Sequence, residues 1–162
     1  MVNFRSKISP FLLLFILFSG CAVHQNYITQ PSTILFKTQK FKYYDAGFIK
    51  TNDFHTIVNI YNSGQTVLNL EIATKQICIN SECYKNSDFN NFILSNAYPE
   101  DTLFNIFNGK DIFYGEGIEF EKDRQKQAIK NQFVDILYEV NQDKIFFVDY
   151  LNSIKIVIRR IK

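Results

Sequence analysis

The stretch FVDILYEVNQDKIFFVDYLNSIKIVIRRI (residues 133–161) decides the fold, because apolar side chains alternate along it in three segments. Its first segment, 133–140, places Val134, Ile136, Tyr138 and Val140 on one side. Such alternation is typical of a strand with one buried face, and short polar turns join antiparallel neighbours. The turns fall at residues 141–143 and 151–153. We therefore predict a three-strand antiparallel meander at the carboxy-terminal end of the chain.

Strand signals also dominate the first half of the domain. Short aromatic segments, 41–44 and 48–49, flank Asp45-Ala46-Gly47, where we expect a bend or bulge. Residues 54–61 alternate with Phe54 on the same face as the other apolar positions, and a turn leads to a partner strand over 66–73.

Helical spacing appears only in the middle of the chain. Ser87 is placed to cap a short helix that ends near Ile93, and Pro99 suits the first position of a second helix that Gly109 ends. Residues 115–132 are polar and predict a loop around one short strand, 118–121. The fold class is therefore α+β, mainly antiparallel β-sheet with a carboxy-terminal three-strand meander and two short inserted helices.

Cys78 and Cys83 flank a predicted hairpin turn at Asn80-Ser81, because asparagine tolerates a positive φ. In that register the two cysteines lie opposite one another, with Cα atoms about 4.5–5.5 Å apart, a separation that a disulfide accepts. A metal site needs more ligands, and the chain has just two histidines, His24 and His55. A redox pair usually has tighter C-x-x-C spacing. We predict a structural disulfide, with a metal site and a redox pair as the alternatives.

The amino terminus has the parts of an export signal. Arg5 and Lys7 form a basic segment, an apolar run of eight residues follows at 11–18, and Ser19 and Gly20 are small. A membrane-spanning helix takes about twenty apolar residues, so this run is too short to be one.

Residues Leu17-Phe18-Ser19-Gly20-Cys21 resemble the junction of bacterial lipoprotein signals. The resemblance implies diacylglycerol on the Cys21 thiol, cleavage before that cysteine and acylation of the new amine. Two or three acyl chains would hold the protein at a membrane, since each buried methylene contributes about 0.8 kcal/mol. Ala22, rather than Asp, implies by the same resemblance the outer membrane, with the domain facing the periplasm. The alternative is an ordinary secretory signal with a chance cysteine.

These signals divide the chain into a signal peptide (1–20), a lipidated flexible tether (21–33) and one globular domain (34–162). The whole chain has 18 basic and 16 acidic residues, and Arg5 and Lys7 leave with the signal, so the mature protein has 16 of each. Clustered cations occur only at the carboxy terminus, which we interpret as a solvated chain end. We therefore expect no nucleic-acid partner.

No catalytic motif supports an enzyme. The sequence lacks G-x-x-x-x-G-K, G-x-G-x-x-G, G-x-S-x-G and H-E-x-x-H. His55 sits in an alternating strand, where a half-exposed sheet position is the simpler interpretation, and Glu119 and Glu121 fit a solvated face. We expect no catalytic residues, no cofactor and no metal site.

Residues 44–48, the paired cysteines, and Tyr98-Pro99 leading to 108–113 resemble a loosely defined family of small outer-membrane lipoproteins from AT-rich Gram-negative bacteria. The resemblance implies a similar lipid-anchored domain and supplies neither an activity nor site residues.

The sequence thus predicts a lipid-anchored, non-enzymatic cell-envelope protein, an accessory or scaffold in an envelope assembly. Its expected partners are the membrane and another envelope protein. One alternative is a binding protein or inhibitor of cell-wall hydrolases, which a protruding loop with an exposed acidic residue would favour. A second is an enzyme acting on cell-wall material, which a deep pocket holding His55 with two carboxylates would favour.

Overall fold

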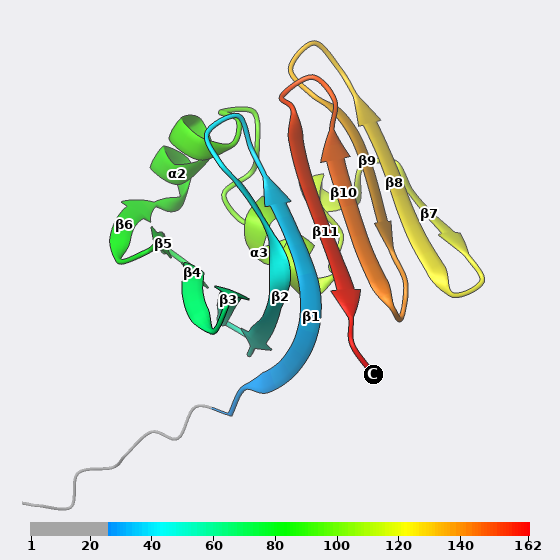
Figure 1. The fold of residues 1–162 in the computed structure, drawn as a ribbon. Helices are drawn as coiled ribbons and strands as arrows, with labels where there is room; N and C mark the ends of the chain where they lie inside the picture. The colour runs from blue at the N-terminus through cyan, green and yellow to red at the C-terminus, as the bar shows by residue number, and fades with distance from the viewer. Residues whose placement is uncertain (1–25) are drawn as a thin grey trace, which may run out of the picture.

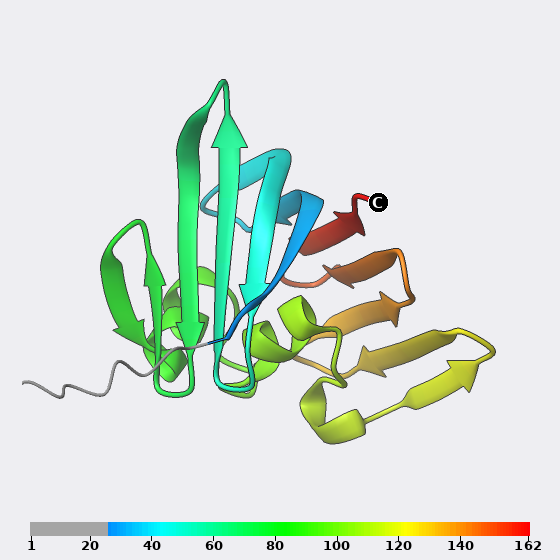
Figure 2. The same cartoon turned by 90° about the horizontal axis from the view of Figure 1, so that it is seen from below.

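The computed structural model describes residues 26–162, in which eleven strands form one curled antiparallel sheet around two short helices (Figures 1 and 2). The strands are β1 (Ile28–Lys37), β2 (Lys42–Thr51), β3 (His55–Asn62), β4 (Gln65–Ala73), β5 (Gln76–Ile79), β6 (Glu82–Lys85), β7 (Ile118–Glu121), β8 (Arg124–Lys130), β9 (Asp135–Val140), β10 (Lys144–Asp149) and β11 (Ile154–Arg160). The helical elements are α2 (Asn86–Ile93), α3 (Thr102–Asn108) and a short 3-10 turn, η2 (Phe113–Gly115).

Two meanders make up the sheet, and they meet at its centre. The strand order is β6-β5-β4-β3-β2-β1-β11-β10-β9-β8-β7, so every neighbouring pair is consecutive in sequence except β1 and β11. The first and last strands therefore lie side by side, while the helical segment connects the two outer edges through the hollow of the sheet (Figure 2).

The alternation in the sequence determines which face of the sheet forms the core. Val134, Ile136 and Tyr138 are buried in the hollow, as are Ile154, Ile156 and Ile158 of β11. The predicted α+β class, the mainly antiparallel sheet, the carboxy-terminal meander and the two short helices are confirmed. The predicted end of α3 is confirmed as well, since Gly109 follows it with φ at 66°. Ser87 is not the cap of α2, which begins one residue earlier.

Buried and half-buried polar side chains attach the helical segment to the sheet. Gln127 of β8 accepts the backbone N–H of Ile112 and donates to its carbonyl, both at 2.9 Å. Asn108 at the end of α3 donates to the Thr56 hydroxyl of β3 at 2.8 Å. Tyr98 donates its hydroxyl hydrogen to Asp149 of β10 at 2.8 Å. Because such buried groups are satisfied only in this arrangement, they fix where the helices lie.

The predicted boundary at residue 34 is wrong, because β1 begins at Ile28. Residues 28–33 look like a tether in sequence because they are polar and include Pro31, which lacks a backbone N–H. The structure compensates for that missing donor: the Gln30 amide donates to the Ile161 carbonyl at 3.4 Å, beside the bond from the Ile161 N–H to the Pro31 carbonyl.

Three further predictions about the strands are wrong. Residues 42–51 form one continuous strand without a bulge, because Gly47 lets β2 pass close to the Asn59 carbonyl of β3. Residues 124–130, expected as loop, form β8. Its sequence has no clear apolar alternation because, of its two buried side chains, only Ile129 packs in the core, while Gln127 bonds to backbone. Phe54 lies outside β3 and is 73% exposed.

The cysteine hairpin is confirmed. Asn80 and Ser81 both have positive φ, and they join β5 to β6 with Cys78 opposite Cys83. The two cysteines form a disulfide, with Cα atoms 3.9 Å apart, closer than expected from sheet geometry alone.

Candidate functional site

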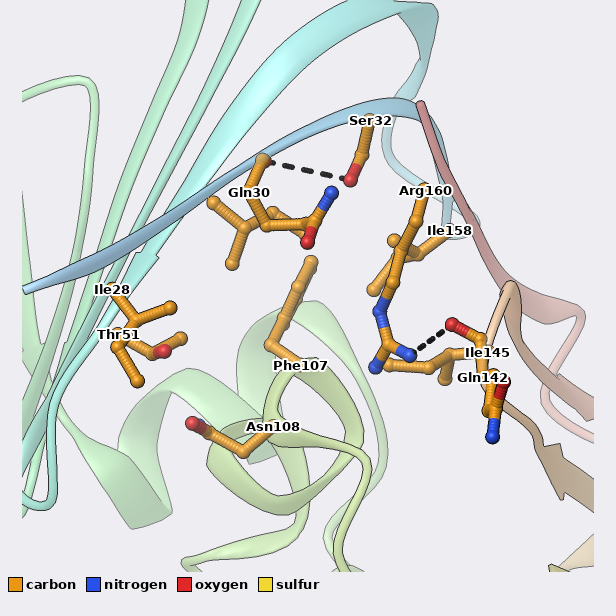
Figure 3. A pocket seen from close by; sticks show the side chains of 11 residues that line it. Ile28, Gln30, Ser32, Thr51, Phe107, Asn108, Gln142, Ile145, Ile158 and Arg160 are labelled. Carbon is orange, nitrogen blue, oxygen red and sulfur yellow. Dashed lines mark hydrogen bonds between the residues drawn. The ribbon is translucent and has the colours of Figure 1, made fainter. Parts of the chain in front are cut away.

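A cavity of about 400 Å³ opens where the central strands meet the end of α3 (Figure 3). It lies at the end of the sheet where β1 begins and β11 finishes. Its lining comes from β1, β2, β10, β11, α3 and the turn after β9: Ile28, Gln30, Ser32, Ile49, Thr51, Phe107, Asn108, Gln142, Ile145, Ile158 and Arg160.

The inner wall of the cavity is apolar and rigid. Ile49, Phe107, Ile145 and Ile158 are buried and belong to the main hydrophobic core. They come from three strands and a helix that pack against one another, so the wall is already formed without a ligand. An apolar surface of this kind favours a ligand with a hydrocarbon part.

Arg160 supplies the charge of the cavity. Because side chains alternate along β11, Arg160 lies on the same face as Ile154, Ile156 and Ile158, and it is in register with Ser32 of β1. One nitrogen, Nη1, donates to the carbonyl oxygens of Asn141 (3.2 Å) and Gln142, which fixes the side chain across the mouth (Figure 3). Within residues 26–162 no carboxylate forms an ion pair with Arg160.

Uncharged polar groups complete the rim. The amide nitrogens of Gln30 and Asn108 are used in bonds to protein oxygens. Their amide oxygens and the Thr51 hydroxyl have no protein partner in the part of the chain that the structure describes. The two amide oxygens can accept a hydrogen bond from the polar end of a ligand, and the Thr51 hydroxyl can accept or donate one.

The lining has the groups needed to bind an anion. A guanidinium presents paired N–H donors that match a carboxylate or a phosphate group, and it keeps its charge at physiological pH. Of the described residues that line the cavity, Arg160 alone has an ionisable side chain. The Ser32 and Thr51 hydroxyls therefore have no neighbouring base within the lining that would activate them as nucleophiles.

The residues singled out in the sequence lie elsewhere. Cys21 falls outside the described residues. The disulfide lies in the β5–β6 hairpin at one edge of the sheet. A hydrogen bond of 2.7 Å joins His55 Nδ1 and the Tyr27 hydroxyl, and His55 borders a wide depression in which Glu71 supplies the one carboxylate among the described residues that line it. The deep pocket with His55 and two carboxylates, which would favour an enzyme, does not form in residues 26–162.

Sequence reasoning missed Arg160, although a signal for it was present. The pair Arg159-Arg160 looks like a solvated chain end when counted as charge. Continued alternation from Ile154, Ile156 and Ile158 would have placed Arg160 inward and Arg159 outward. Ser32 and Gln30 had no comparable signal, because their segment has no apolar period.

Comparisons with known proteins assign no role to the residues of the cavity. No protein-family model matches the chain, and no curated protein matches it. Among the described residues, no group of three or more His, Cys, Asp or Glu side chains is arranged to hold a metal ion. None of the helices in residues 26–162 has the length and apolar character needed to span a membrane.

Proposed function

We propose that the protein is a lipid-anchored, non-catalytic binding protein of the bacterial cell envelope whose ligand is an amphipathic anion. The observation that carries the proposal is Arg160, the one cation among the described residues that line the cavity, which lies beside a buried apolar wall and forms no ion pair within residues 26–162. An anion with a hydrocarbon body satisfies both parts at once: its carboxylate or phosphate group pairs with the guanidinium, and its apolar part covers Ile49, Phe107 and Ile145.

The location is part of the same proposal. The export signal and the lipoprotein junction before Cys21 support a location at a membrane surface, and we propose the outer membrane. There the domain would act as an accessory of an envelope assembly by holding such an anion near the lipid. A membrane-anchored binding protein needs no turnover, which agrees with a cavity lined for recognition alone.

Calorimetric titration with dodecanoate, compared with dodecanol, tests the pocket. Arg160→Gln is expected to weaken dodecanoate binding about tenfold to hundredfold, since a hydrogen bond to a charged group contributes about 1.5–3 kcal/mol. Arg159→Gln is the matched control, because it removes the same charge from the opposite face of β11. Arg160→Lys keeps the positive charge but removes the planar set of N–H donors of the guanidinium. It therefore tests whether affinity depends on the charge alone or also on the geometry of those donors.

The proposal is contradicted if the parent protein binds neither compound, or if dodecanoate and dodecanol bind the parent and Arg160→Gln equally. Circular dichroism melts of each variant show whether the loss of the Arg160 bonds to the 141–142 backbone has disturbed the fold.

A second candidate is a protein-binding function, as in the inhibitor alternative, and one observation favours it. The β7–β8 hairpin forms one outer edge of the sheet (Figure 2). It carries Phe120, which is 74% exposed, between Glu119 and Glu121. Arg124 lowers the pKa of Glu121 through a hydrogen bond and its charge. An exposed strand edge with an apolar anchor is suited to pairing with a partner strand.

Cross-linking in intact envelopes tests that candidate. The lipidated parent, Phe120→Ser and the control Phe54→Ser, which changes an exposed ring outside the hairpin, are compared. A partner retained by the parent and Phe54→Ser but lost by Phe120→Ser supports hairpin docking. The same partners with all three proteins would exclude it.

A further inference from the structure

The outward face of the four central strands is basic. Because side chains alternate along a strand, the residues opposite the core on β2, β1, β11 and β10 all point away from the helices. Six of them are cations: Lys37, Lys42, Lys50, Lys144, Lys155 and Arg159. The acidic residues of these strands, Asp45 and Asp149, lie in register with inward-facing Ile34 and Ile154. Within the described residues, this central face therefore carries no carboxylate.

Several of these cations oppose one another directly. Lys37 pairs in register with Lys42 on one side and with Lys155 on the other, and Lys144 pairs with Arg159. Like charges directly opposite in a sheet are destabilising. None of the five forms an ion pair with a carboxylate in the described part of the chain. The arrangement costs stability in the free protein, and an anionic partner would relieve that cost.

Apolar groups lie between the cations. Leu35 is in register with Tyr44 and with Val157, and Val157 is in register with Phe146. The amino groups of Lys144 and Lys155 lie 4.7 and 5.5 Å from the centre of the Phe146 ring. A hollow of about 200 Å³ is lined by apolar Leu35 and Val157 together with Lys155 and Arg159. Two cations beside apolar side chains suit a phosphate group attached to a hydrocarbon region.

We propose that this face, defined by the six cations above, lies on a bilayer surface and binds the phosphate groups of anionic lipids. The sheet curves so that its middle strands form the crest of the outward side, and β1 is the middle strand of eleven (Figure 1). Cys21 precedes Ile28 by seven residues, a span of at most about 25 Å when fully extended. A lipid on Cys21 would therefore keep the face within reach of headgroups. The inference uses the proposed anchor for proximity alone, and the charge pattern stands without it.

Vesicle co-sedimentation tests the inference on the mature chain from residue 21 with Cys21→Ser, which contains every described strand and the whole core but no lipid. We expect partitioning onto vesicles containing phosphatidylglycerol, little onto phosphatidylcholine alone, and release at high salt. Lys37→Gln/Lys155→Gln/Arg159→Gln should lower the partition coefficient about hundredfold, since each basic residue at such a surface contributes about fivefold. Lys75→Gln/Lys110→Gln/Lys122→Gln removes the same charge elsewhere and should change it little.

Equal losses in the two triple variants would overturn the inference, because net charge alone would then explain binding. Absence of vesicle binding by the parent, or binding of single-stranded oligothymidylate in its place, would also overturn it. The first triple variant should melt no lower than the parent, since it removes three like-charge contacts. The same triple variant should still bind dodecanoate. The vesicle experiment and the dodecanoate titration can therefore contradict the basic face and the Arg160 pocket independently of each other.

Discussion

At the scale of single residues, Gly47 shows how closely two strands approach. A Cβ atom at this position would lie 2.1 Å from the Asn59 carbonyl oxygen, which belongs to the backbone and cannot move aside. We expect Gly47→Ala to cost about 3 kcal/mol, the upper end of the overpacking range. Gly64 in the β3–β4 turn is the matched control, with open space but φ at 80°. Gly64→Ala should cost about 1 kcal/mol through backbone strain alone. Urea unfolding of both variants measures this; equal losses would contradict the close approach.

Two buried tyrosines make the fold sensitive to alkali. Burial raises the pKa of Tyr98, and the charge of Asp149 and the hydrogen bond to it raise it further. Burial also raises the pKa of Tyr138, helped by Asp111 and opposed by Arg160. Unfolding returns both phenols to a pKa near 10.0, so the unfolded chain binds fewer protons than the folded one above that pH. Stability should be intact below about pH 10 and fall above it, by up to about 1.4 kcal/mol per pH unit for each phenol.

Unfolding free energies between neutral and strongly alkaline pH test this. Tyr98→Phe and Tyr138→Phe should each flatten the decline, whereas Tyr150→Phe, which changes an exposed ring, should keep the parent's slope. At neutral pH, Tyr98→Phe should also cost about 1.5–3 kcal/mol, because Asp149 loses one of its donors. Parallel alkaline curves for the parent and both buried variants would show that neither phenol controls the transition.

At the scale of elements, the position of β1 predicts that removing residues before 34 destabilises the fold, whereas the sequence alone predicts no effect. A tether has no burial to lose, but β1 pairs with β2 from Ile28 onward and contains the fully buried Ser32. A chain beginning at residue 34 should therefore be at least about 2 kcal/mol less stable than one beginning at residue 26, a drop of roughly 4–8 °C in melting temperature. Equal melting temperatures would mean that residues 28–33 do not belong to the sheet in solution.

The carboxy-terminal strand gives a stronger effect of the same kind. β11 lies between β10 and β1 and joins the two meanders. Deleting residues 154–162 removes the buried Ile154, Ile156 and Ile158 and leaves two bare strand edges at the centre of the sheet. We expect aggregation or degradation instead of a folded protein. Soluble protein that melts like the parent would contradict the position of β11.

Elements were predictable where one face of a strand is buried against apolar groups. The carboxy-terminal meander, the cysteine hairpin and the end of α3 at Gly109 follow from alternation, turn residues and a helix-ending glycine. β8 and the start of β1 were not predictable, because Ile129 is the one buried apolar side chain of β8 and hydrogen bonds from Gln127 and Gln30 replace apolar contacts at their own positions. The contact of β1 with β11 was not predictable either, since nothing local in the sequence specifies pairing between the two ends of a domain.

At the scale of the whole molecule, charge is distributed unevenly although residues 21–162 contain equal numbers of basic and acidic side chains. The central outward face is basic, while carboxylates such as Asp53, Glu100 and Asp101 border a cavity between the helical segment and the β2–β3 turn. An overall count of charges hides this separation. The Arg160 pocket opens at the same end of the sheet as the start of β1, so the proposed anchor, the basic face and the proposed ligand site are joined by one strand.

Anchoring through Cys21 is the prediction on which the location of the whole molecule depends. Replacing this cysteine removes the thiol that would carry diacylglycerol, so Cys21→Ser should incorporate no palmitate and should accumulate as uncut precursor or soluble protein. Cys78→Ala/Cys83→Ala is the matched control, because it removes cysteines without touching the junction. That variant should still fold and keep the label, since the short loop closed by the disulfide, with a sequence separation of 5, contributes only about 2 kcal/mol. Palmitate labelling in growing cells, followed by membrane fractionation, measures both variants. Unchanged labelling of Cys21→Ser would exclude the lipid anchor, whereas loss of label in both variants would place the defect in folding or export.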